Sequence, residues 1–378
     1  MPRRLDLSLR RDLVAGSPTF GDRSPRARRS RLPGLALSAI ALSAIAVAAC
    51  GPDAEPSTAD AGASDAAPLP YDASVTPETL SQSGLYSDTA AGLLAPGVRP
   101  FEPRFELWTD GVDKRRWVYL PEGETIDNAH GDYWIYPEGT RLWKEFARDG
   151  MRLETRLLVK TGPEERDWYM MAYVWNEDET DAVAAPLGEP SARGTGHPVP
   201  SQAECMDCHE QMTDRALGFS AIQLDHPTDA PGVTLQTLLA EGRLRYGTGS
   251  AAPPHYPLPG DEPDQQVLGY LHANCGSCHN SRSEVLAGVA NRPRLLLSID
   301  ERERASVEAT PLYDSTVGVR ATQPHAGRYL VQPGEPDDSA VYRRMTSREP
   351  TSAMPPLGTA LVDGDAAAQV RAWIEALP

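Results

Sequence analysis

The residues best suited to chemistry fall into two copies of one pattern, Cys-x-x-Cys-His. The copies are Cys205-Met206-Asp207-Cys208-His209 and Cys275-Gly276-Ser277-Cys278-His279. Two cysteines separated by two residues and followed by histidine form the pattern for covalent attachment of c-type haem. Two thioether bonds hold the macrocycle, and the next residue can offer its imidazole to the iron. We therefore expect two haem c groups, attached at Cys205, Cys208, Cys275 and Cys278, with His209 and His279 as axial iron ligands.

The elements around the second copy must position its haem. Apolar residues recur at helical spacing over 264–274, which predicts a helix that leads into Cys275. Near the end of the chain, Asp363 can cap a helix that runs to Leu377. Between them stands Ala353-Met354-Pro355-Pro356-Leu357-Gly358. The two prolines restrict φ and remove backbone donors, which suits a loop that presents one thioether in a fixed position.

A helix that enters the haem motif, a Met-Pro loop and a terminal helix bearing a tryptophan together resemble class I cytochrome c. The resemblance covers about the last 115 residues. It implies an all-α domain in which Met354 is the distal iron ligand opposite His279. Met345 is the alternative ligand, although it stands in a helix-like stretch without flanking prolines. The segment between His279 and Met354 is long for this family, and its residues 294–299 are typical of a β-strand.

The first copy has no such frame. A helix is predicted to begin at Glu204 and to include the motif. Met212 lies only three residues after His209, on the same side of the iron, so it is not expected to reach the opposite face. The sixth position of this iron stays open. Its candidate ligands are His197, His226, His255, Met170 and Met171.

The N-terminus has the features of an export signal. Arginines up to Arg31 precede an apolar run from Leu35 to Val47, which is too short to span a bilayer comfortably. The run ends in Val47-Ala48-Ala49-Cys50, which resembles the lipobox of bacterial lipoproteins. This resemblance implies lipidation of Cys50. The following residues are almost all Ala, Asp, Pro, Ser, Gly and Thr, which predicts a disordered linker.

Six of the seven tryptophans lie between Val75 and Gly196, among short stretches of two-fold alternation. Strands are predicted at 116–120, 151–160 and 168–175, with a hairpin turn at Asp149-Gly150. The sequence thus predicts a multidomain α+β chain. Its parts are a lipoprotein signal peptide (1–49), a disordered linker (50–74), a β-rich sandwich-like domain (75–196), a first haem-motif segment (197–262) and an all-α class I cytochrome c-like domain (263–378).

The formal net charge of −17 argues against nucleic acid as a partner, because both are anionic. We expect a one-electron carrier of the cell envelope, held by a lipid anchor, with the outer membrane favoured. Its redox partners would be proteins such as a periplasmic dehydrogenase or an oxidase. Two alternatives compete. One is a dihaem peroxidase-like enzyme with an open first haem, and the other is a structural protein whose four cysteines hold zinc or form disulfides.

Overall fold

A computed structural model describes residues 76–378, apart from 228, 246–254 and 323–326. The predicted signal peptide, the linker and the lipidation site Cys50 therefore lie outside the described residues. The described part belongs to one compact unit of the chain, Ser64–Pro378. The domain boundaries near residues 197 and 263 stay predictions. Among the described helices, none has both the length and the apolar character needed to cross a membrane.

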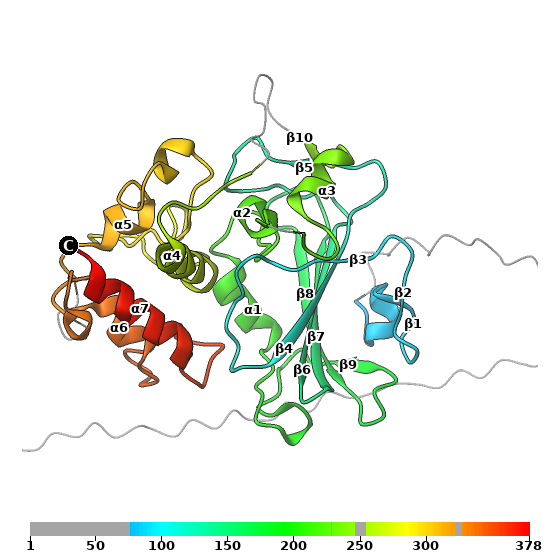
Figure 1. Cartoon of the computed structure of the whole chain (residues 1–378). Helices are drawn as coiled ribbons and strands as arrows, with labels where there is room; N and C mark the ends of the chain where they lie inside the picture. Colours follow the sequence, from blue (N-terminus) through cyan, green and yellow to red (C-terminus); the bar gives the residue numbers. More distant parts are fainter. Residues whose placement is uncertain (1–75, 228, 246–254, 323–326) are drawn as a thin grey trace, which may run out of the picture. The chain divides into compact units, whose positions relative to one another are not determined.

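Six strands form one antiparallel sheet in the order β3-β4-β6-β7-β8-β9 (Figure 1). They are β3 (Arg99–Pro100), β4 (Asp113–Tyr119), β6 (Arg141–Arg148), β7 (Met151–Lys160), β8 (Trp168–Trp175) and β9 (Ala182–Ala184). The strands predicted at 116–120, 151–160 and 168–175 are confirmed as parts of β4, β7 and β8. The turn at Asp149-Gly150 is confirmed too. Both residues have positive φ, as a two-residue hairpin that matches the strand twist requires.

Two separate two-stranded sheets occur in addition to this six-stranded sheet. Strand β1 (Tyr86–Asp88) pairs with β2 (Leu93–Leu94), and β5 (Ile126–Asp127) pairs in parallel with β10 (Leu244–Arg245). Short 3₁₀ helices also occur in the described residues. They span Leu80–Ser83, Ala192–Gly194, Glu301–Arg304 and Pro336–Asp338.

The prediction of a sandwich-like β domain is wrong. One face of the sheet packs against the segment that contains Leu80, Leu85 and Tyr86. The opposite face contributes Val118 and Met170 to a cluster whose other members come largely from helices and loops further along the chain. Alternation in the sequence predicts strands with one buried face. It does not reveal that both faces are covered, nor that helices and loops, and not a second large sheet, cover them.

Seven α-helices occur in the described part of the chain. They are α1 (Gln202–His209), α2 (Ala221–Leu224), α3 (Leu235–Ala240), α4 (Glu262–Cys275), α5 (Pro311–Thr316), α6 (Ala340–Met345) and α7 (Gly364–Ala376). The helices predicted over 264–274 and from Asp363 to Leu377 are confirmed as α4 and α7. These two helices pack together, and the Trp373 indole donates a hydrogen bond of 2.9 Å to Asp264.

The prediction of an all-α C-terminal domain is also wrong. Between α4 and α7 only two six-residue α-helices occur in the described chain, and the backbone also forms β-bridges, including Val317 with Val331 and Tyr329 with Ser339. The strand predicted over 294–299 is absent as well. Backbone N–H groups of this segment bond to the second motif and α4, since Leu295 donates to the carbonyl of His279 and Leu297 donates to Nδ1 of His272.

Gly269 allows α4 to pack directly on the Phe105 ring. A Cβ at this position would overlap the ring. Alanine favours a helix over glycine by about 1 kcal/mol, but we expect Gly269→Ala to lower the free energy of unfolding by about 1–3 kcal/mol, as overpacking of a core does. Urea unfolding measures this change. Phe105→Leu in the same chain should restore part of the loss, and a stabilised single variant would contradict the packing argument.

Candidate haem-attachment site

The first motif occupies α1, which is fixed at its start by a capping box. The Ser201 hydroxyl accepts a hydrogen bond from the backbone N–H of Glu204, and the Glu204 carboxylate accepts one from the N–H of Ser201 at 2.8 Å. Serine and glutamate at this spacing satisfy two of the free donors of a helix start. Helix α1 then presents Cys205 and Cys208 one turn apart and ends at His209.

His209 has the tautomer that iron ligation requires. Its Nδ1 lies 2.6 Å from the backbone carbonyl oxygen of Arg215. A carbonyl oxygen only accepts, so Nδ1 carries the proton and the lone pair is on Nε2. Burial lowers the pKa of His209 to about 4, so the ring is neutral near pH 7. A histidine whose other nitrogen donates to a backbone carbonyl is the usual arrangement for a metal ligand.

The loop after His209 is held by a buried carboxylate. Asp214 is completely buried and accepts hydrogen bonds from the Trp168 indole at 2.9 Å, the backbone N–H of Tyr136 and the ammonium group of Lys160. Asp214 and Arg215 both have positive φ, which turns the chain back so that the carbonyl of Arg215 meets the His209 ring. Asp214 therefore positions His209 without touching it.

The second motif follows α4 directly. Asp261 caps the start of α4, and the helix ends at Cys275. The backbone N–H of His279 bonds to the carbonyl of Cys275 at 2.9 Å, which continues the helical turn through the motif. Burial lowers the pKa of His279 to about 4, so this ring is neutral as well. Its Nδ1 is buried and has no hydrogen-bond partner among the described residues.

Asn280 and Gln211 join the two motifs. The buried Asn280 amide donates to the carbonyl of Gln211 at 3.2 Å and to the carbonyls of its own turn, Gly276 and Ser277. In return, the side-chain oxygen of Gln211 accepts from the Ser283 hydroxyl at 3.2 Å. The residues that follow each motif are thus bonded to each other across 69 positions of sequence.

The thiols of the two motifs also meet. Cys208 and Cys278 share a hydrogen bond, which raises the pKa of the Cys208 thiol and lowers that of Cys278. All four motif cysteines are free thiols. Within the described residues, no three histidine, cysteine or carboxylate side chains are grouped as a shared metal ion would require. One cysteine of each motif, Cys208 and Cys278, therefore lies next to the other motif.

A cavity of about 360 Å³ lies between the motifs. Both motifs border it, through Cys205, Cys208 and His209 of the first and Cys278 of the second. The loop 355–359, which follows Met354, forms another part of its wall. This volume is within the range of about 300–1,000 Å³ for small-molecule and cofactor pockets. Paired thiols, a neutral imidazole with a free Nε2 and an adjoining cavity are a donor set that fits haem c.

Three of the predicted site residues do not border this cavity in the described structure: Cys275, His279 and Met354. Arg344 lies near the last two. Its carbonyl accepts the backbone N–H of Met354 at 3.0 Å, and its charge contributes to the low pKa of His279. The alternative ligand, Met345, packs against the large hydrophobic cluster beside the sheet. The assignment of Met354 stays a prediction.

The candidates for the sixth position of the first iron separate into two groups. His226 and His255 are engaged elsewhere, by the Glu102 carbonyl and the Asp225 carboxylate. His197, Met170 and Met171 border the cavity. His197 is almost completely buried, its Nε2 lies 2.7 Å from Glu154, and its Nδ1 has no partner in the described chain. Among the histidine candidates for the sixth ligand of the first iron, His197 therefore has a ring nitrogen available for coordination.

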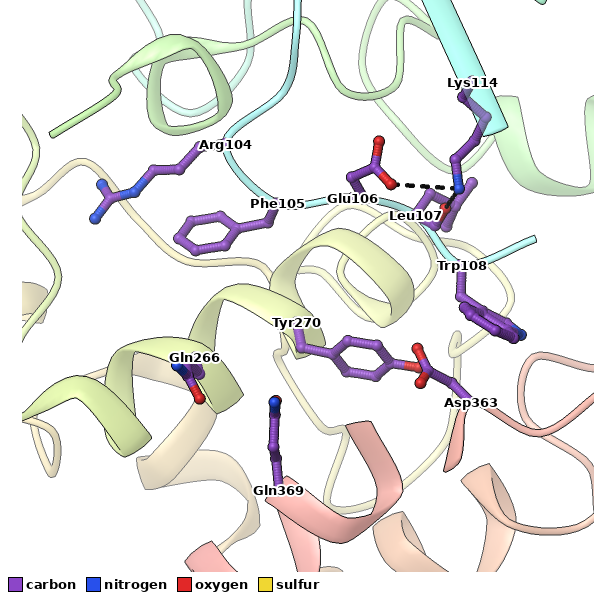
Figure 2. A pocket seen from close by; sticks show the side chains of 10 residues that line it. All are labelled: Arg104, Phe105, Glu106, Leu107, Trp108, Lys114, Gln266, Tyr270, Asp363 and Gln369. Carbon is purple, nitrogen blue, oxygen red and sulfur yellow. Dashed lines mark hydrogen bonds and ion pairs between the residues drawn. The ribbon is translucent and has the colours of Figure 1, made fainter. Parts of the chain in front are cut away.

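A second cavity, of about 440 Å³, lies between the loop at 104–108, helix α4 and the start of α7 (Figure 2). Lys114 forms a 3.5 Å salt bridge with Glu106 at its edge, and Tyr270 hydrogen-bonds to the Asp363 carboxyl. Trp108 and Lys114 line this pocket together with the residues from Arg104 to Leu107. The Asn274 side chain fixes this loop, since its oxygen accepts from the N–H of Trp108 at 2.7 Å. None of the motif residues borders this pocket.

Comparison with protein-family models, curated proteins and solved structures gives no match to this chain.

Proposed function

We propose that this chain is a c-type electron-transfer protein of the cell envelope with two covalently attached haems. The observation that carries the proposal is the meeting of two Cys-x-x-Cys-His segments at one cavity. Their thiols touch at Cys208 and Cys278, and their following residues bond through Asn280 and Gln211. Two copies of one motif, 70 residues apart in sequence, thus lie together in the fold.

The residues that would hold each haem follow from the motifs. Cys205 and Cys208 would form the first pair of thioethers, with His209 as the proximal ligand. Cys275 and Cys278 would form the second pair. His279 and Met354 would then be the axial ligands of the second iron. When bound, haem c supplies a one-electron Fe(III)/Fe(II) couple, whose potential a His/Met ligand pair raises relative to two imidazoles.

The chain's own residues prepare the first site. The carbonyl of Arg215 holds the proton of His209 on Nδ1 and orients the ring. Burial keeps the imidazole neutral, so no proton has to leave before ligation. Helices and loops pack against one sheet face beside the motifs, and the four motif cysteines are half-buried. Fixed ligands suit electron transfer, because little reorganisation accompanies the change of charge.

The redox partners would be proteins of the periplasm, such as a dehydrogenase as donor and an oxidase as acceptor. The excess of acidic residues, which gives the net charge of −17, favours a basic docking surface on a partner. Lipidation at Cys50 would attach the protein to a membrane, with the outer membrane favoured.

The proposal predicts two haems per chain. Protein co-expressed with a cytochrome c maturation system should give a pyridine haemochrome spectrum of c-type haem, with two haems per polypeptide. Cys205→Ala with Cys208→Ala should lower the count to one, and so should Cys275→Ala with Cys278→Ala. All four substitutions together should give a colourless protein. A colourless wild-type chain from a strain that matures a control cytochrome, or bound zinc in its place, would exclude the proposal.

A further inference from the structure

Three cations lie in a row across neighbouring strands on the cavity side of the sheet. Arg116 of β4 is directly opposite Lys144 of β6, and Lys144 is directly opposite Arg156 of β7. All three border the cavity between the motifs. Neighbouring strands are about 4.8 Å apart, so the row extends over roughly 10 Å. Like charges directly opposite each other in a sheet are destabilising, so this row needs an explanation.

Only one of the three cations is fully neutralised by the protein. Arg156 forms two hydrogen bonds, of 3.0 and 2.6 Å, with the completely buried carboxylate of Glu154. Arg116 bonds at 3.2 Å to Glu106, whose side chain is 59% exposed, and the other guanidinium nitrogen, Nη2, is buried without a partner. Lys144 forms no hydrogen bond or salt bridge with any of the described residues, and its ammonium group lies 4.9 Å from the centre of the Phe146 ring.

The electrostatic consequence is strongest at Lys144. Burial, followed by the charges of Arg116 and Arg156, holds the pKa of Lys144 well below its ordinary value. Burial also lowers the pKa of Arg116. A buried charge without a partner is costly, and it is normally paired or it loses its proton. An anion in the cavity would satisfy the Lys144 ammonium and the free Nη2 of Arg116 together.

The row also has a direction relative to the first motif. Arg156 borders the same cavity as Cys205 and Cys208 and interacts with both side chains, so the Arg156 end lies near the attachment thiols. Lys144 and Arg116 follow in order away from that end. In haem c the two propionates are on the side of the macrocycle opposite the two thioethers. A haem attached at Cys205 and Cys208 would therefore direct its carboxylates toward Lys144 and Arg116.

We propose that Lys144 and Arg116 form a carboxylate-binding site for the propionates of the haem attached at Cys205 and Cys208. This inference rests on the proposed function, because it needs haem at the first motif. Ammonium and guanidinium groups bind carboxylates through charge-assisted hydrogen bonds, which are strongest where water is excluded. Filling the site would convert a repulsive row into a neutral network.

The test is the reduction potential of the matured protein. Lys144→Met should leave two haems per chain and lower the midpoint potential of one of them, because loss of the cation favours the more positive, oxidised iron. We expect the equilibrium constant for reduction to fall by about tenfold, which is 59 mV for one electron. Arg116→Gln should act in the same direction, and Lys144→Arg should keep the wild-type potential. Redox titration followed in the α-band measures each midpoint.

Arg115→Gln is the matched control. Arg115 is a cation of the same strand as Arg116, but it pairs with Glu145 and does not border the cavity, so its loss should not shift either midpoint. Two haems with unshifted potentials in both Lys144→Met and Arg116→Gln would overturn this inference and leave the proposed function intact. A chain without haem would overturn both. Added succinate should not shift the wild-type potentials, and a shift would assign the site to a free anion instead.

Discussion

Replacement of Asp214 by alanine is expected to lower the free energy of unfolding by about 3–5 kcal/mol, the usual cost of breaking a buried ion pair by removing one partner. Asp214 and Lys160 are both completely buried, and Asp214 also accepts the Trp168 indole N–H at 2.9 Å. The substitution leaves the Lys160 ammonium without its carboxylate in a place that water does not reach. Guanidinium unfolding of the matured protein, followed by tryptophan fluorescence, measures the loss.

The same variant has a second, local consequence. Without Asp214 the loop no longer holds the carbonyl of Arg215 against Nδ1 of His209. The first haem should therefore show weakened axial ligation, seen as partial high-spin absorption, while the second haem keeps its spectrum. Glu210→Ala is the control, because this carboxylate is in the same segment but 49% exposed, and its 3.6 Å ion pair with the Arg215 side chain should contribute less than about 1 kcal/mol to stability. A stable Asp214→Ala protein with two unchanged haem spectra would contradict the assigned role.

Local patterns predicted the strands and long helices well. The patterns that predict β7, β8 and α4 are local in sequence. Alternation with β-branched and aromatic residues predicts the two strands, and helical spacing of apolar residues predicts α4. The hairpin at Asp149-Gly150 depends on two residues that tolerate positive φ. Such features are decided by neighbours in sequence, so the sequence alone reveals them.

Features that depend on distant segments were missed or wrong. The sandwich prediction failed because burial on both faces of a strand does not identify what covers each face. The all-α prediction failed because the residues between His279 and Met354 bond to α4 and to each other in irregular segments and bridges. No pattern in sequence placed Cys208 beside Cys278, since that contact depends on how separate segments fold on one sheet.

The cationic row could have been noticed in part. Leu142, Lys144 and Phe146 are at alternate positions of β6, so their side chains are on the same face of the strand. A cation between two apolar residues on one face is unusual. Arg116 has the same position relative to Val118 in β4. The register that places them opposite each other is not a property of either strand alone. The sequence does not reveal the buried role of Asp214, because a single aspartate after a motif resembles an ordinary turn residue.

The contact between Cys208 and Cys278 predicts strong electronic interaction between the two haems. Macrocycles attached to sulfurs that touch begin from adjacent points, so their intense Soret transitions should couple. We expect the circular dichroism of the matured protein to show a Soret couplet, with one positive and one negative lobe. Each single-motif variant, with one pair of cysteines replaced by alanine, should show a simple band. The sum of the two variant spectra should fail to reproduce the wild-type couplet.

Gln211→Ala separates proximity from haem content. It removes the side-chain oxygen that accepts from the Ser283 hydroxyl at 3.2 Å, and it alters neither the residues proposed to bind haem nor the turn of the second motif. We expect two haems per chain and a smaller couplet, because the segments after the motifs are no longer bonded through this side chain. A wild-type protein with two haems whose spectrum equals the sum of the single-motif variants would refute direct contact.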